Sequence, residues 1–166
     1  MRSSEGRVGR VFVIRLDDGD VVPDCIERFA AERAVSTGYA LLVGGVGSGE
    51  VVVGPRDSAA MPPDPMALPL DGAHEVSGVG VLAPGADGKP ALHMHAALGR
   101  AGRTMTGCLR KGVKTWLVGE AVLVEITGAA VRRVKDEKSG FALLVPAGEP
   151  GKRGKPPPRR ITQAPR

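Results

Sequence analysis

The sequence predicts an α+β domain in which one main helix packs on a mixed, antiparallel-rich sheet. Only one segment places apolar residues at helical spacing, whereas seven or more segments carry the β-branched or alternating runs typical of strands. Most of these strand-like segments follow one another directly, which favours antiparallel pairing. The 24 glycines and 14 prolines also indicate frequent turns and few long helices.

The chain begins with a strand, a turn and the helix. Residues Val8–Leu16 alternate and are rich in β-branched side chains, and Asp17-Asp18-Gly19 forms a turn after them. Asp20 can cap a helix over Val21–Ala34. Pro23 is compatible with that helix because it falls in the first turn. The apolar face of the helix consists of Val22, Ile26, Phe29, Ala30 and Ala34.

The middle of the chain contains a glycine cluster. The strand Gly38–Val46 runs into Gly44–Gly49, which lacks the spacing of nucleotide-binding glycine loops. We therefore expect a tight bend or a close approach of backbones there. Glu50–Gly54 is the next strand, and Pro55–Leu70, with five prolines, is expected to be a long loop. Further strands are predicted at His74–Ala83, Ala91–Gly99, Thr104–Arg110, Thr115–Ile126, Val131–Val134 and Phe141–Val145.

Length and composition exclude several classes of protein. The 166 residues suit one domain, and an aromatic content of 3% argues against a stacking platform for single-stranded nucleic acid. The two cysteines do not form a disulfide framework. The sequence shows neither a signal peptide nor a long apolar span, which predicts a soluble cytoplasmic protein.

The positive charge is concentrated at the C-terminus. Residues 1–145 carry 17 basic and 17 acidic residues, so the net charge of +5 comes entirely from residues 146–166. This segment also contains six prolines, and we expect it to be a disordered, extended tail. Within it, Arg153-Gly154-Lys155-Pro156 resembles an arm that follows the minor groove of A·T-rich DNA. The candidate DNA-binding residues are Lys152, Arg153, Gly154, Lys155, Pro156, Arg159 and Arg160. A basic tail that only aids solubility is the alternative.

A candidate metal site comes from His93, His95 and Cys108. Two residues apart on a strand, the two imidazoles project from one face of the sheet. If Arg100–Arg103 is a four-residue hairpin loop, Gly99 faces Thr104 and His95 lies opposite Cys108. A loop longer by one residue would turn Cys108 away. Two histidines and a thiolate suit zinc or another borderline divalent metal. Alternatively, all three are ordinary strand residues without a metal.

Several motifs together resemble the PPC domain, the domain shared by plants and prokaryotes. They are Gly44-Gly45-Val46-Gly47-Ser48, Leu92-His93-Met94-His95-Ala96, Thr106-Gly107-Cys108-Leu109 and Trp116-Leu117-Val118-Gly119-Glu120. The resemblance spans residues 8–145, and a domain over residues 1–145 is expected. It implies a homotrimer, and metal binding at His93, His95 and Cys108. Cys108 stands where many relatives carry a third histidine, which favours a softer metal such as zinc.

The resemblance also bears on DNA binding. In plants this domain is joined to an AT-hook, whose core is R-G-R-P; here Lys155 replaces the second arginine and the motif follows the domain. The expected function is therefore that of a trimeric DNA-binding protein whose tails contact A·T-rich minor grooves, associated with the nucleoid. The alternative is a zinc-binding protein that binds a small molecule, or an enzyme, at the site of the two histidines and the cysteine.

No complete catalytic constellation is visible in the sequence, so an enzyme is not predicted. Glu120 could support the metal or act as a base, or it could lie at the subunit surface as an ordinary polar residue. His74, the remaining histidine, has no predicted place near the other two.

Overall fold

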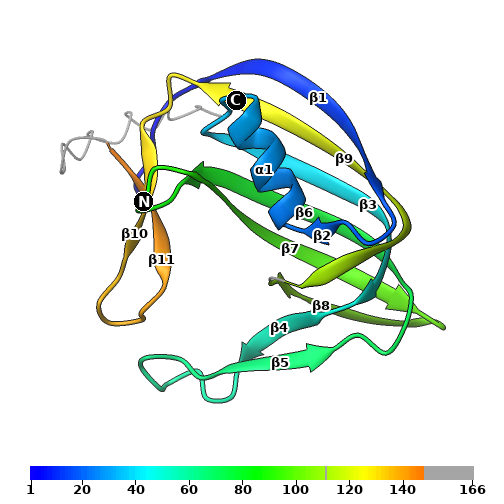
Figure 1. Cartoon of the computed structure of the whole chain (residues 1–166). Helices are drawn as coiled ribbons and strands as arrows, with labels where there is room; N and C mark the ends of the chain where they lie inside the picture. The colour runs from blue at the N-terminus through cyan, green and yellow to red at the C-terminus, as the bar shows by residue number, and fades with distance from the viewer. Residues whose placement is uncertain (111, 148–166) are drawn as a thin grey trace, which may run out of the picture.

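A computed structural model describes residues 1–110 and 112–147 of the chain. In that part, one short helix, α1 (Asp24–Glu32), accompanies a nine-stranded sheet that curves around it (Figure 1). The sheet follows the order β1-β9-β3-β6-β7-β8-β4-β5, with β2 paired to β9. The strands are β1 (Arg7–Asp17), β2 (Val21–Val22), β3 (Gly38–Ser48), β4 (Glu50–Pro55), β5 (Pro65–Pro69), β6 (His74–Pro84), β7 (Pro90–Arg100), β8 (Arg103–Leu109) and β9 (Val113–Thr127).

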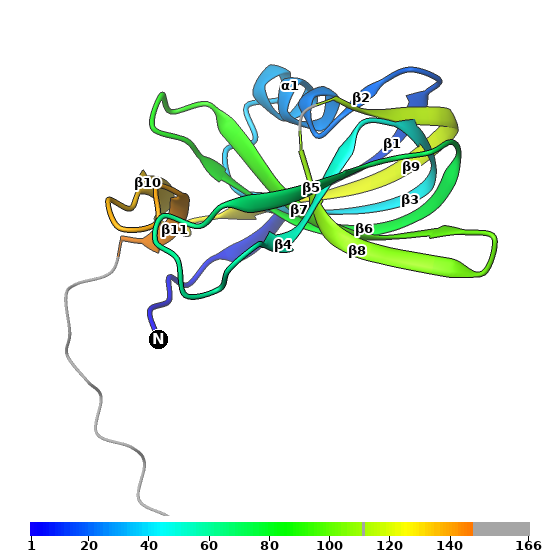
Figure 2. The same cartoon turned by 90° about the horizontal axis from the view of Figure 1, so that it is seen from below.

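The α+β prediction is confirmed, but the sheet is not mixed. Every strand pairing among the described residues is antiparallel. The strands are joined mostly by short connections, which favour antiparallel neighbours over the long crossovers that parallel pairs require. A separate hairpin of β10 (Val131–Lys135) and β11 (Ala142–Pro146) stands beside the main sheet (Figure 2).

The helix is shorter than the predicted Val21–Ala34. Val21 and Val22 pair with β9, and the helix begins only after Pro23. Asp20 does not cap the helix: its carboxylate accepts a hydrogen bond from the backbone N–H of Asp17, at 2.9 Å, within the preceding turn. Ile26 and Ala30 are fully buried against the sheet, which confirms that part of the predicted apolar face. Ala34 does not belong to this face, because it lies beyond the end of the helix and is exposed.

The glycine cluster confirms the expected close approach of backbones. Gly44 and Gly45 lie in β3 where its pairing with β9 shifts, and a side chain at either position would collide with the backbone of β9. The predicted loop Pro55–Leu70 is wrong in one part, since Pro65–Pro69 forms β5 and pairs with β4. A proline can join an edge strand because one side of that strand makes no ladder hydrogen bonds.

The two faces of the sheet differ in burial. One face packs on α1 through buried residues such as Leu42, Leu82, Met94 and Leu123. The other face presents a cross-strand row in which Val13, Val122, Leu41, Val79 and His95 are successive register partners. Val13, Leu41 and Val79 are exposed in the single chain, at 83%, 46% and 56%. The candidate metal ligands thus lie at the end of an exposed apolar row.

No helix in the described residues is long and apolar enough to span a membrane.

Candidate metal centre

The β7–β8 hairpin places the two histidines and the cysteine together. Gly99 pairs with Thr104 and His95 with Cys108, so the predicted register is confirmed. Arg100 and Arg103 also pair, which shortens the loop to Ala101-Gly102 without changing the register. Both loop residues have positive φ, as the tight hairpin turn that matches strand twist requires.

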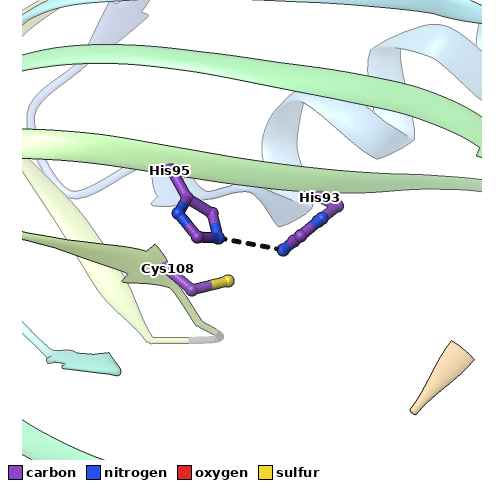
Figure 3. A group of neighbouring side chains, drawn as sticks. All are labelled: His93, His95 and Cys108. Carbon is purple, nitrogen blue, oxygen red and sulfur yellow. Dashed lines mark hydrogen bonds between the residues drawn. The ribbon is translucent and has the colours of Figure 1, made fainter. Parts of the chain in front are cut away.

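His93, His95 and Cys108 form the metal-ligand cluster (Figure 3). Both imidazoles project from β7 on the face away from α1, since the intervening Met94 is buried in the core on the opposite face. Their Nε2 atoms are 3.1 Å apart, and the three potential ligand atoms all lie within 4.8 Å of one another. Zinc sites have metal–ligand distances of about 2.0–2.3 Å, so donors at this spacing need only small side-chain rotations.

The cluster lines a pocket of about 550 Å³. Strands β4, β7 and β8, the β5 edge and the β10–β11 hairpin supply its walls, which are mainly apolar. Two arginines, Arg110 and Arg133, line it as well. Pockets of this size and apolar character are typical of small-molecule sites. The three donor atoms therefore face a space that could hold a ligand.

Burial and the nearby arginines set the protonation of the cluster. The pKa of His93 is lowered, first because burial disfavours the imidazolium and then because His95, Arg133 and Arg110 repel it. Burial raises the pKa of the Cys108 thiol, and the charges of Arg110 and Arg133 oppose this shift. His93 is therefore neutral, as a metal ligand must be, whereas Cys108 must lose a proton to bind.

Arg133 connects the β10–β11 hairpin to the main sheet. Its Nε donates to the carbonyl oxygen of Ala91 at 3.3 Å, and its Nη2 donates to that of Val81 at 2.8 Å. Burial lowers the pKa of Arg133, and the nearby carboxylate of Glu27 partly offsets the shift. Nothing in the sequence indicated these hydrogen bonds to the main sheet, because an arginine in an alternating strand is expected to point into solvent.

The other candidate residues lie away from the cluster. Glu120 is on β9, separated from β7 in the sheet order by β3 and β6. His74 is buried at the start of β6, where its Nδ1 is 2.8 Å from the carbonyl oxygen of Gly72. Neither residue belongs to the ligand cluster. The candidate DNA-binding residues, Lys152, Arg153, Gly154, Lys155, Pro156, Arg159 and Arg160, lie outside the described residues.

The family follows from the sequence and agrees with the fold. The family model of the Plants and Prokaryotes Conserved (PCC) domain matches residues 3–127. The chain belongs to the PCC (PPC) family. This confirms the resemblance carried by the histidine and glycine motifs. No curated protein matches the chain.

Solved structures show the same PCC fold. A metal-containing protein from Archaeoglobus fulgidus is 28% identical, with a TM-score of 0.75 over 87% of this chain and 99% of that one. A plant- and prokaryote-conserved protein from Pyrococcus horikoshii is 24% identical, with the same TM-score over 87% and 97%. A candidate DNA-binding protein from Ralstonia eutropha is 18% identical, with a TM-score of 0.65 over 80% and 89%.

Proposed function

We propose that this PCC-domain protein binds one divalent metal ion, zinc by preference, through His93, His95 and Cys108. The observation that carries the proposal is the gathering of three donor atoms within 4.8 Å at the wall of a pocket. The Archaeoglobus relative, described as metal-containing, supports it. Zinc with three protein ligands keeps a fourth position for a water or a substrate group and acts there as a Lewis acid.

We propose that the site binds a small molecule beside the metal. His93 and His95 orient each other edge to face, with ring centroids 4.9 Å apart, and Cys108 is buried beneath them. Residues of the β10–β11 hairpin line one side of the pocket. The residues present therefore provide a wall against which a ligand can bind.

Metal analysis of the purified full-length chain tests this function. We expect about one zinc per chain, and loss of that zinc in the His93→Ala/His95→Ala double variant and in Cys108→Ala. Cys25→Ala is the matched control, because Cys25 is also a buried free cysteine but lies on α1. Wild-type protein that carries no metal and does not bind added zinc would refute the proposal.

The second function that we propose is binding of A·T-rich duplex DNA by the basic tail. Its support is the charge distribution: residues 1–145 are neutral overall, and six basic residues lie in residues 146–166. Candidate DNA-binding proteins from Ralstonia eutropha and Bacteroides thetaiotaomicron share the fold. Extended basic arms follow the negative potential of narrow minor grooves, and Pro156 favours the extended form.

Duplex titrations at two salt concentrations test DNA binding. The full chain is compared with a chain ending at Ala147, which keeps every described residue of the β10–β11 hairpin. We expect the full chain to prefer an A·T-rich duplex and to bind more weakly at higher salt, because neutralised phosphates release counterions. Equal affinity of the two chains, with equal salt dependence, would exclude the tail as the DNA-binding element.

We further propose that the chain assembles as a homotrimer through the exposed apolar row that contains Val13, Leu41 and Val79. Contiguous exposed apolar surface on a folded chain marks an interaction site. A trimer would also present three basic tails on one scaffold, and the high effective concentration would strengthen otherwise weak DNA contacts.

A further inference from the structure

The pocket beside the metal-ligand cluster has two chemically different parts. Leu109, Phe141, Leu143 and Leu144 contribute apolar walls. Arg110 and Arg133 line the same pocket as His93 and Cys108. An apolar pocket with a few convergent polar groups selects ligands that have one charged end and one apolar end.

The charge of the pocket is one-sided. Among the described residues, its lining includes two arginines and no aspartate or glutamate. Arg110 has no carboxylate partner within ion-pair distance in the part of the chain that the structure describes. Both guanidinium groups line the same pocket as the ligand cluster, which places positive charge beside that cluster. A bound divalent metal would add to this positive charge even with Cys108 as a thiolate.

Arg133 retains donors for a ligand although it is anchored. Its Nε and Nη2 donate to backbone carbonyl oxygens of β6 and β7, and a guanidinium carries five N–H groups. The Nη1 group makes no hydrogen bond to another described residue. A guanidinium held in this way is already oriented, so little conformational entropy is lost when an anion binds.

We infer that this pocket binds a small amphipathic organic anion, with its charged group at Arg110 and Arg133 and its apolar body against Leu109 and the β11 side chains. The inference deepens the proposed metal-binding function. It rests on that function in one respect, which is that the charged group of the ligand lies at the end of the pocket where the metal would bind. Arginine pairs planar carboxylates in a bidentate manner, so a carboxylic acid is the expected class. A pocket of about 550 Å³ accommodates a body of several carbons.

Calorimetric titration of the full-length protein, with and without added zinc, tests the inference with five probes. The probes are hexanoate, butanoate, hexanamide, hexyl phosphate and inorganic phosphate. We expect hexanoate to bind at least about tenfold more tightly than the neutral amide, because only the acid makes charge-assisted hydrogen bonds. Shortening hexanoate to butanoate should weaken binding by about fourfold for each buried methylene. Tighter binding of hexyl phosphate than of hexanoate would still support the inference and identify a phosphate ester.

Three results would overturn the inference. They are equal affinity for hexanoate and hexanamide, binding of inorganic phosphate as tight as that of either organic anion, and no binding of any probe. Equal affinity for hexanoate and hexanamide would show that the charge of the ligand does not contribute to binding. Equally tight binding of inorganic phosphate would show that the apolar walls do not contribute. Each result is independent of whether the protein binds zinc.

Variants locate the binding and separate this inference from the metal proposal. Arg110→Gln should weaken hexanoate binding about tenfold, whereas Arg103→Gln should not, because Arg103 lies at the opposite end of β8. Both side chains are exposed, so neither change should unfold the chain. Zinc titration of the same samples is the second readout. Failure of zinc binding with retained hexanoate binding refutes the metal centre alone, and the reverse result refutes the organic anion alone.

Discussion

His95 lies directly opposite Cys108 across the β7–β8 ladder, so the two side chains share one face of the sheet. The short turn at Ala101-Gly102 fixes this register. A shift of one residue would carry Cys108 to the other face and leave the two histidines without a third ligand. The proposed metal site therefore depends on a turn that begins six residues after His95 and on the strands that pair with β8.

Gly107, on β8, has no room for a side chain. A Cβ atom there would lie 2.4 Å from the carbonyl oxygen of Val52 and 2.6 Å from a side-chain carbon of Val51, both on β4. We expect Gly107→Ala to destabilise the protein by about 1–3 kcal/mol, since neither backbone can move without breaking ladder bonds. Because Cys108 follows directly, zinc affinity should fall as well. Chemical denaturation and zinc titration measure the two effects.

The matched control for Gly107 is Gly99, on β7. The nearest atoms to a Cβ at Gly99 lie 4.0 Å away, so Gly99→Ala should leave stability and zinc affinity nearly unchanged. If the two alanine variants were equally stable, β8 would not pack against β4 as closely as the structure indicates.

Zinc affinity should rise with pH because of Cys108. Burial raises the pKa of this thiol, so at neutral pH it is protonated and must release a proton when zinc binds. Burial lowers the pKa of His93, so that imidazole is already neutral and contributes no proton. Below the thiol pKa, affinity should increase by about tenfold per pH unit. Competition with a chelator between pH 7 and 8.5 measures the slope.

Cys108→His is the comparison for this pH dependence. A third imidazole has an ordinary pKa near 6.5, so the affinity of the variant should level off above pH 7. An identical slope in the wild-type protein and in Cys108→His would show that Cys108 does not supply the proton.

Much of the site could be predicted because its residues lie close together in the sequence, within one hairpin. The alternation of His93 and His95 fixes their common face, and the spacing from Gly99 to Thr104 fixes the partner of His95. The start of the helix was predicted less well, because the pairing of Val21 and Val22 with β9 outweighs the helical periodicity of their sequence. Likewise, Pro65–Pro69 joins β4 through contacts between segments that are ten or more residues apart.

Arg133 shows why the rest of the pocket could not be predicted. Its guanidinium crosses from β10 to β6 and β7, more than 40 residues away in sequence. No spacing rule relates such segments, since their proximity depends on how the whole sheet curves. The family motifs indicate the candidate metal ligands but carry no information on the β10–β11 hairpin, which lies beyond the matched residues 3–127.

Glu125 stabilises the irregular start of β1, and its contribution should depend on pH. Its carboxylate accepts hydrogen bonds from the backbone N–H, Nε and Nη2 of Arg10, at 3.1, 2.7 and 2.8 Å, where the β1–β9 register shifts. These bonds lower the pKa of Glu125 from 4.5 to about 2. A carboxyl group with a lowered folded-state pKa stabilises the fold above its unfolded-state value, and the stabilisation disappears as the pH falls toward 2.

Glu125→Gln tests this contribution. We expect the variant to be less stable than the wild-type protein by about 1 kcal/mol at pH 7, with the difference vanishing near pH 2. Urea denaturation at pH 7, 4 and 2.5 measures the difference. Glu120→Gln, on the same strand, is the control and should change little, because Glu120 is exposed and has no ion pair among the described residues. A difference for Glu125→Gln that did not vary with pH would contradict the assignment.

Charged substitutions in the exposed apolar row should disrupt the trimer without affecting metal binding. Val13→Lys/Leu41→Lys places two charges at the proposed trimer interface, where burying them without partners is unfavourable. By light scattering, we expect the wild-type mass to be three times the 17.2 kDa of one chain and the variant to be a monomer. Leu68→Lys is the control, because Leu68 is an exposed apolar residue on the edge strand β5 and should leave the trimer intact.

All three proposed metal ligands lie on β7 and β8 of one chain, and neither Val13 nor Leu41 pairs with any of them. The Val13→Lys/Leu41→Lys monomer should therefore still bind about one zinc. Its DNA affinity should fall to that of a single tail, because the gain from three linked tails is lost. If the double variant remained trimeric, another surface would form the interface. Loss of zinc together with the trimer would show instead that the metal site requires a neighbouring subunit. That result would contradict a cluster that is complete within one chain.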